Sequence, residues 1–159
     1  MRAVIREVGN IELLTRPLNT EEIDELYQRA DVVMSLHRSE GFGLVMAEAM
    51  LHGLPVIATD WSANRDFLND SNWMPVRCSL VPVVEPQGEY NRSDLRWADP
   101  DVRCASAKLK VLHSDSRLTA ELGQRAREDA VRVFNAEIYS DAVTGIVSDA
   151  RIPQARTAQ

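Results

Sequence analysis

Two carboxylates, Glu40 and Glu48, lie on either side of a glycine-containing turn that the sequence predicts to open a helix. The turn holds Gly41 and Gly43, which allow a ligand to approach the backbone closely. The first turn of a helix presents unpaired N–H groups and the positive end of the helix dipole, and both attract phosphate. An ionised carboxylate only accepts hydrogen bonds, which suits it to sugar hydroxyls. The stretch therefore predicts a site for a nucleotide-sugar, with one glutamate on each of its two sugars.

The same residues also have a simpler interpretation. Glycine-rich turns are common in α/β domains, and helical glutamates usually lie in solvent. The segment around Glu48 favours ligand binding, because residues 44–51 (LVMAEAML) are apolar on nearly all sides. We expect this helix to be buried on most faces, so that Glu48 needs a partner there. That partner is a ligand hydroxyl, Arg65 or a backbone N–H.

Length and composition predict one globular domain. The chain has 159 residues, of which 45% are hydrophobic and 26% charged, and this is enough to form a core. We expect a single domain over residues 1–150 and a flexible tail at 151–159. The net charge of -6 argues against a nucleic-acid-binding surface, because such surfaces collect Lys and Arg.

The cysteines and the hydropathy pattern predict a reduced, cytoplasmic setting. Cys78 and Cys104 are too few for a disulfide scaffold, and neither has a Cys or His at metal-ligand spacing. The N-terminus does not resemble a signal peptide. No apolar run approaches the roughly 20 residues that cross a bilayer, which excludes a membrane span and leaves peripheral attachment to the inner face of the membrane open.

Helical and strand patterns alternate along the first half of the chain. The predicted elements are a short strand at 10–14, a helix capped by Asn19 and Glu22, a buried strand at 31–36, the helix at 44–51 ending at Gly53, and a strand at 55–59. Strand, helix and strand in this order form a right-handed parallel crossover. The fold class is therefore α/β, with a Rossmann-like parallel sheet flanked by helices. Ligands bind beyond the carboxyl ends of such strands, where residues 38–43 and 60–64 emerge.

The second half predicts a loop followed by helices. Residues 69–99 lack periodicity and contain several prolines, which indicates a long surface loop with one strand at most. Helices are predicted from 101 to 114, around 118–126 and around 138–146. In the first of these, we expect Val102, Ala105, Leu109 and Leu112 to face inward.

Several motifs in order resemble the C-terminal, donor-binding half of family 4 (group 1) glycosyltransferases, which are retaining enzymes of the GT-B type. The motifs are residues 25–32 (ELYQRADV), 40–48 (EGFGLVMAE), 53–59 (GLPVIAT), 61–68 (WSANRDFL) and 97–102 (WADPDV). The stretch 61–68 is similar to a Trp-Ser-Gly-Asn-x-Asp-Phe motif of one bacterial subgroup. Ala63 replaces the glycine of that motif, which puts the tight turn there in question. The resemblance spans most of residues 20–134.

The resemblance implies a role for each residue of the site. Glu40, the candidate catalytic residue, would position the donor sugar through its hydroxyls and would not act as a nucleophile. Glu48 would bind the ribose. The backbone amides of Gly41, Phe42, Gly43, Leu44 and Val45 would contact the sugar and the diphosphate. The loop with Arg16, Pro17 and Leu18 would line the base. No metal or cofactor is expected, and the substrate would be a UDP- or GDP-hexose.

The resemblance also implies that parts of the enzyme lie outside this chain. Relatives carry a glycine, an arginine and a lysine near the start of this domain, and the cations neutralise the diphosphate. They also have an acceptor-binding N-terminal half. We therefore predict an N-terminally truncated domain, either part of a longer enzyme or a natural fragment, that is inactive alone. The acceptor would be a glycan such as a growing bacterial surface polysaccharide.

Two other classes of protein stay open. The first is a non-catalytic nucleotide- or partner-binding module that uses the same half-fold. The second is a GT-B epimerase or phosphorylase fragment, because a fold does not determine chemistry. The three histidines are predicted to be structural, and His37, one turn before Glu40, is the strongest candidate for a ligand contact.

Overall fold

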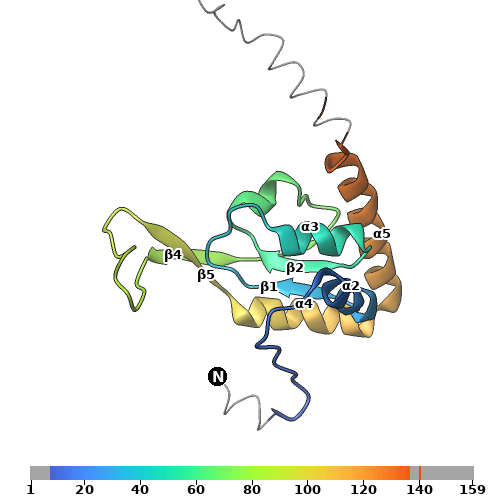
Figure 1. Ribbon diagram of the computed structural model, residues 1–159, viewed down its shortest axis with the longest axis horizontal. Helices are drawn as coiled ribbons and strands as arrows, with labels where there is room; N and C mark the ends of the chain where they lie inside the picture. The colour runs from blue at the N-terminus through green and yellow to red at the C-terminus, as the bar shows by residue number, and fades with distance from the viewer. Residues whose placement is uncertain (1–7, 137–139, 141–159) are drawn as a thin grey trace, which may run out of the picture.

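The computed structural model describes residues 8–136 and residue 140. It has a three-stranded parallel sheet in the order β1 (Val33–Ser35), β2 (Val56–Thr59) and β3 (Met74–Val76) (Figure 1). Helices pack on both faces of this sheet. The predicted α/β class, a parallel sheet flanked by helices, is therefore confirmed.

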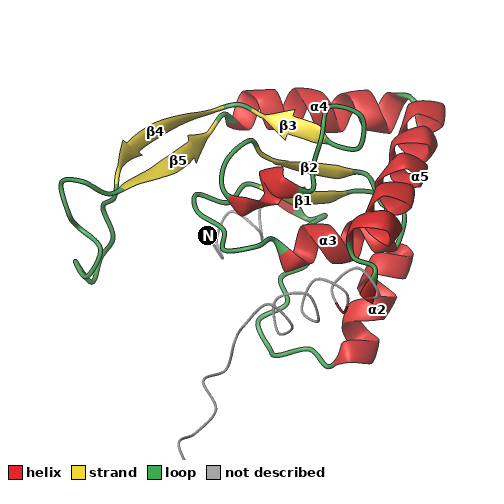
Figure 2. Ribbon diagram, turned by 90° about the horizontal axis from the view of Figure 1, so that it is seen from above, coloured by secondary structure: helices red, strands yellow, loops and turns green. Residues whose placement is uncertain are grey.

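The helices form a layer on each side of the sheet. Helix α3 (Leu44–Leu51) lies on one face of the sheet and α4 (Val102–Ser114) on the other (Figure 1). Helix α5 (Ser116–Val133) runs along the end of the sheet and packs against α3 (Figure 2). The first core cluster joins α3, α5 and β2, and includes Met46, Met50, Val56, Ala58, Ala126 and Ala130. The second cluster joins α4 to the sheet, and consists of Ile57, Val76, Ala105 and Leu112. Every residue of β2 is buried, as expected for a central parallel strand.

Helix α2 (Thr20–Arg29) begins at the predicted capping box. The Asn19 side chain accepts a hydrogen bond from the Glu22 N–H at 2.8 Å, and the Glu22 carboxylate accepts one from the Asn19 N–H at 3.0 Å. Both contacts satisfy N–H groups that a helix start leaves without a partner. The Arg16 guanidinium, helped by this capping contact, lowers the pKa of Glu22 to about 2. No residue of α2 is buried, so the helix and its cap lie on the surface of the domain.

The segment 69–99, predicted as a long loop with one strand at most, instead contains β3 and most of an antiparallel hairpin. Its strands are β4 (Cys78–Pro82) and β5 (Arg96–Pro100), with Val81 opposite Trp97. The hairpin projects from the edge of the sheet to which β1 and β2 point (Figure 1). The prediction was wrong because the two strands pair across an intervening loop, and each ends in a proline, Pro82 or Pro100, a residue that is rare in strands.

Two other predictions also need correction. Residues 10–14 do not form a strand, because a strand needs a neighbour to accept its backbone hydrogen bonds and the described residues supply none. On α4, Ala105 and Leu112 are buried as predicted, whereas Val102 is 66% exposed and Leu109 is 43% exposed. The sheet covers a narrower stripe of α4 than its apolar pattern suggests. The helix predicted around 138–146 and the tail at 151–159 lie outside the described residues.

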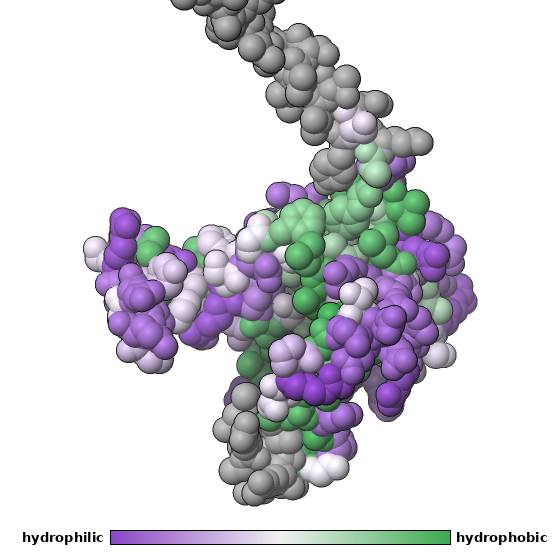
Figure 3. Space-filling model, viewed as in Figure 1, coloured by the Kyte–Doolittle hydropathy of each residue, from purple (hydrophilic) through white to green (hydrophobic). Residues whose placement is uncertain are grey.

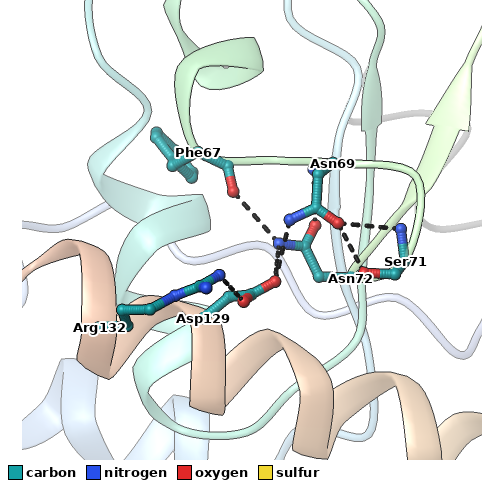
Figure 4. Close-up of polar contacts among 6 residues, drawn as sticks. All are labelled: Phe67, Asn69, Ser71, Asn72, Asp129 and Arg132. Carbon is teal, nitrogen blue, oxygen red and sulfur yellow. Dashed lines mark hydrogen bonds and ion pairs between the residues drawn. The ribbon is translucent and has the colours of Figure 1, made fainter.

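A polar cluster fastens the loop after residue 66 to α5 (Figure 4). The Asp129 carboxylate accepts hydrogen bonds from the side-chain amides of Asn69 and Asn72, each at 2.9 Å. Asn72 is fully buried, and its amide also donates to the Phe67 carbonyl at 3.2 Å. The contact from Asn69, with those from Asn72 and Arg132, holds the pKa of Asp129 below its usual range.

We expect Asp129→Asn to destabilise the fold by about 1–3 kcal/mol at neutral pH, because a buried amide then faces another amide. A depressed carboxyl pKa gives stability that is complete above the unfolded-state pKa of about 3.9 and is lost as the pH falls through the folded-state pKa. The difference between the wild type and the variant should therefore shrink on acidification below about pH 4. Urea unfolding at several pH values measures it. Asp94→Asn is the control, because the Asp94–Arg92 pair is exposed. A constant difference at all pH values would contradict this assignment.

Candidate functional site

The loops that follow β1 and β2 meet at one edge of the sheet. The loop after β1 carries Glu40 and leads into α3, and the loop after β2 contains a short 3-10 helix (Ala63–Asp66). The Glu40 N–H donates a hydrogen bond to the Ser62 hydroxyl at 3.2 Å. Because parallel strands end at the same edge, the two segments predicted to emerge there do lie together.

The two glycines of the turn differ in what they do. Gly43 has a φ of +99°, and a Cβ added there would lie 2.7 Å from Met46 Cε and 3.3 Å from Phe67 Cζ. Gly41 has open space around the position of a Cβ. Gly43 is therefore required by the backbone conformation and by its neighbours. Gly41 leaves room for a ligand beside it, and its N–H donates a hydrogen bond to Glu40 Oε1 at 3.0 Å.

The N-terminus of α3 has the form of an anion site. Gly43 is its N-cap residue, and no side chain caps the helix. The Gly43 carbonyl accepts from the N–H groups of Met46 and Ala47, both at 2.9 Å. The N–H groups of Leu44 and Val45 lie one position earlier, at the positive end of the helix dipole. An uncapped helix start of this kind suits a phosphate group.

The exposed face of α3 includes Glu48, contrary to the expected burial. Leu44 is 64% exposed and Val45 is 56% exposed, and Glu48 lies on the same side of the helix. Apolar residues gather over α3 and the adjoining part of α5 (Figure 3). The composition of an apolar helix does not say which faces the rest of the fold covers, and here one face stays open. Glu48 thus lies in solvent beside the helix start.

Tyr27 of α2 holds the Glu48 side chain, a contact that sequence reasoning missed. Its hydroxyl donates to Glu48 Oε2 at 2.9 Å, and its ring stacks on His52 with centroids 4.9 Å apart. Burial of the phenol, together with the Glu48 carboxylate, raises the pKa of Tyr27 well above its usual value. The phenol therefore stays protonated and remains a donor. In the sequence, Tyr27 stands out only as a member of the motif at 25–32, and nothing there points to Glu48.

His37 links the end of β1 to the loop after β2 through hydrogen bonds. Its Nε2 lies 2.9 Å from the Trp61 carbonyl oxygen and 3.1 Å from Asn64 Oδ1, and its Nδ1 lies 3.2 Å from Ser35 Oγ. A carbonyl only accepts, so Nε2 carries the proton and Nδ1 of the neutral ring accepts from Ser35. Both nitrogens bind protein groups, which favours the structural role. His52 likewise has a protein partner, Asp24, at 3.2 Å.

The segment proposed to line the base contacts the start of α2 instead. Arg16 forms a salt bridge with Glu22. Within residues 8–136, no hydrogen bond or ion pair joins Arg16, Pro17 or Leu18 to Glu40 or Glu48. Arg65, considered as a partner of Glu48, pairs with Asp60 at 3.1 Å. The base-binding role of 16–18 stays a prediction.

The β4–β5 hairpin is attached directly to the Glu40 loop. The Arg38 guanidinium lies over the Trp97 ring, 4.6 Å from its centroid, and forms an ion pair with Asp99. The Arg38 carbonyl accepts from the Ala98 N–H at 2.8 Å. These contacts make the hairpin part of the same edge of the molecule as the candidate site.

No group of three or more His, Cys, Asp or Glu side chains in the described part of the chain is arranged to hold a metal ion. None of the helices there is both long and apolar enough to cross a membrane.

Comparison with known proteins relates part of this chain to one family. Residues 6–75 match the sequence model described as glycosyl transferases group 1. The sulfoquinovosyl transferase SQD2 of Arabidopsis thaliana is 27% identical over 121 residues, which are 76% of this chain and 20% of the plant protein. The chain thus spans about a fifth of the length of that relative.

Two solved structures have a similar fold. The C-terminal domain of the group 1 glycosyl transferase LpcC from Francisella tularensis has a TM-score of 0.56 and 25% identity, covering 83% of this chain and 58% of that domain. HepE of Anabaena, solved with UDP-glucose, has a TM-score of 0.63 and 21% identity, covering 92% of this chain and 35% of HepE.

The parallel sheet, its two helical layers and the turn at its carboxyl edge define a Rossmann-like α/β domain. The matches with LpcC and HepE place that domain in the C-terminal half of the GT-B fold. Residues 6–75 of the chain are similar to the group 1 glycosyltransferases, and its fold is similar to that of the C-terminal domain of one of them.

Proposed function

We propose that this chain is the donor-binding domain of a retaining glycosyltransferase that transfers a hexose from a UDP- or GDP-hexose to a glycan acceptor. The observation that carries the proposal is the arrangement at α3, where an uncapped helix start lies between two carboxylates. HepE, which shares the fold, was solved with UDP-glucose, and this supports a uridine nucleotide-sugar.

Each part of the site has a separate task in this proposal. The diphosphate lies at the N-terminus of α3, where the amides of Leu44 and Val45 and the helix dipole stabilise its charge. Glu40 accepts hydrogen bonds from the hydroxyls of the donor sugar. Glu48, oriented by Tyr27, accepts them from the ribose.

A retaining transfer places a particular demand on the protein. The acceptor attacks on the face from which the diphosphate leaves, so the departing charge must be stabilised there by fixed donors and cations. The amides of α3 supply part of that stabilisation. Cations and the acceptor site come from the part of the enzyme outside this chain, so the isolated chain is inactive in transfer. The enzyme works in the cytoplasm or at the inner face of the membrane.

A titration of this chain with UDP, GDP, ADP and their hexose conjugates tests the proposal. Ligand at about a hundred times its dissociation constant adds about 2.7 kcal/mol of stability and raises the melting temperature by several degrees. We expect a shift with one base and its hexose conjugate. Glu48→Gln should reduce it, because a charge-assisted hydrogen bond of about 1.5–3 kcal/mol is lost. The matched control is Glu128→Gln on the exposed side of α5.

The outcomes separate two functions. A base-selective shift that depends on Glu48 supports donor binding. Absence of any shift, with stable dimers in solution, would instead support a non-catalytic partner-binding module. The exposed apolar side chains of Phe42, Leu44 and Val45 at the start of α3 are the observation that favours this second candidate.

A further inference from the structure

The loop after β2 contains a residue in a backbone conformation that side chains rarely adopt. Ser62 has φ 76° and ψ -164°, and it is the one non-glycine residue with positive φ among the residues that the structure describes. This region of backbone space is occupied almost only by glycine. Such strain persists where the surrounding structure enforces it and is concentrated at functional sites.

The neighbours of Ser62 hold its backbone on both sides. Before it, the Trp61 N–H donates to the Thr59 carbonyl at 2.8 Å, and the Trp61 carbonyl accepts from His37. After it, the Ser62 carbonyl accepts from the Arg65 N–H at 3.2 Å. The loop is thus fastened to β2, to the end of β1 and to the short helix that follows.

The strained conformation places the Ser62 hydroxyl on the Glu40 loop. Ser62 Oγ accepts the hydrogen bond from the Glu40 backbone N–H at 3.2 Å. A glycine at position 62 would adopt this conformation without strain, but it would lack the hydroxyl. A serine in this conformation therefore costs stability through backbone strain. That cost is offset only if the hydroxyl makes a contact that the fold or the site needs.

We propose that Ser62 is a positioning residue that orients Glu40 toward the donor sugar. The inference rests on the proposed function. Ser62 does not contact the sugar; it fixes the backbone from which the Glu40 side chain extends. Glu48 and the amides of α3 serve the nucleotide, and neither depends on the Ser62 hydroxyl. Loss of the hydroxyl should therefore weaken the nucleotide-sugar more than the free nucleoside diphosphate.

Two substitutions separate the hydroxyl from the strain. Ser62→Ala removes the hydroxyl and keeps the strained Cβ, whereas Ser62→Gly removes both. We expect both variants to lower the affinity for the nucleotide-sugar relative to the nucleoside diphosphate by about 2- to 12-fold, the value of one hydrogen bond. Ser62→Gly should melt above Ser62→Ala. Ser114→Ala, whose hydroxyl bonds only within its own helix, is the control and should change neither quantity.

Calorimetric titration with UDP and UDP-glucose measures the affinity ratio, and amide hydrogen exchange measures the bond itself. The Glu40 N–H should lose protection in both Ser62 variants and keep it in Ser114→Ala. An unchanged affinity ratio or unchanged protection in both variants would overturn the proposal. If the wild type binds neither ligand, the proposed function fails. Hydrogen exchange at Glu40 then still decides whether Ser62 positions this loop.

Discussion

Gly123→Ala is expected to destabilise this domain, although the same change usually strengthens a helix. An alanine in place of a helical glycine normally adds about 1 kcal/mol of stability. At position 123, however, the new Cβ would overlap the Gly53 carbonyl oxygen and lie 3.1 Å from Gly53 C and 3.4 Å from Pro55 Cδ. These are backbone and ring atoms that cannot rotate away. Helix α5 must therefore move from the turn that follows α3.

The movement affects the larger core cluster. Ala126 and Ala130 of α5 are completely buried against α3 and β2, so a displaced α5 loses these contacts. Overpacking of this kind costs about 1–3 kcal/mol. Each kcal/mol corresponds to a fall of roughly 2–4 °C in melting temperature for a domain of this size. Urea unfolding followed by the fluorescence of Trp73, which is 6% exposed, measures the loss.

The control for Gly123 lies one residue further along the same helix. Gln124 is exposed and bonds only to Glu128 on its own helix, so Gln124→Ala should change stability by less than about 0.5 kcal/mol. A Gly123→Ala variant as stable as Gln124→Ala would show that α5 and the turn at Gly53 separate without cost. The close approach would then not be a requirement of the fold.

Gly43→Ala is expected to impair both folding and nucleotide binding. A left-handed conformation costs a non-glycine residue about 1–2 kcal/mol. The new Cβ would also press on Met46 Cε at 2.7 Å and on Phe67 Cζ at 3.3 Å. The Met46 methyl can rotate away, so the main cost is the backbone strain at φ +99°, and relief of that strain shifts the start of α3 and the amides of the proposed diphosphate site. We expect at least about tenfold weaker binding of a nucleoside diphosphate, equivalent to about 1.4 kcal/mol.

Gly41→Ala is the matched control within the same turn. No atom lies within 4 Å of its added Cβ, and its backbone conformation is open to any residue. Its stability should therefore remain within about 0.5 kcal/mol of the wild type. Any loss of nucleotide-sugar binding in Gly41→Ala would then report direct contact with the ligand. Wild-type binding by Gly43→Ala would contradict the placement of the diphosphate at α3.

Predictions from local sequence were accurate where the interactions are local. The capping box of Asn19 and Glu22, three residues apart, forms as predicted. So does the start of α4, where Asp101 accepts a hydrogen bond from the Cys104 N–H. These contacts depend on residues within one helical turn, whose types and spacing are visible in the chain.

Predictions failed where distant segments decide the outcome. The strand expected at 10–14 is absent from the described structure, and a hairpin occupies part of the expected loop at 69–99. The exposure of Glu48 and its bond to Tyr27, 21 residues away, likewise had no local signal. Strand pairing and helix coverage depend on which neighbour is present, and a residue pattern does not contain that information.

The sequence by itself determined the likeness to group 1 glycosyltransferases, the α/β class, the glycine turn and the two carboxylates beside it, because these follow from ordered motifs and short-range periodicity. Only the tertiary structure decided which face of α3 is open, that Gly43 and not Gly41 is required by the backbone, and that Ser62 reaches the Glu40 loop. Each of these depends on contacts between segments that meet only after the sheet has formed.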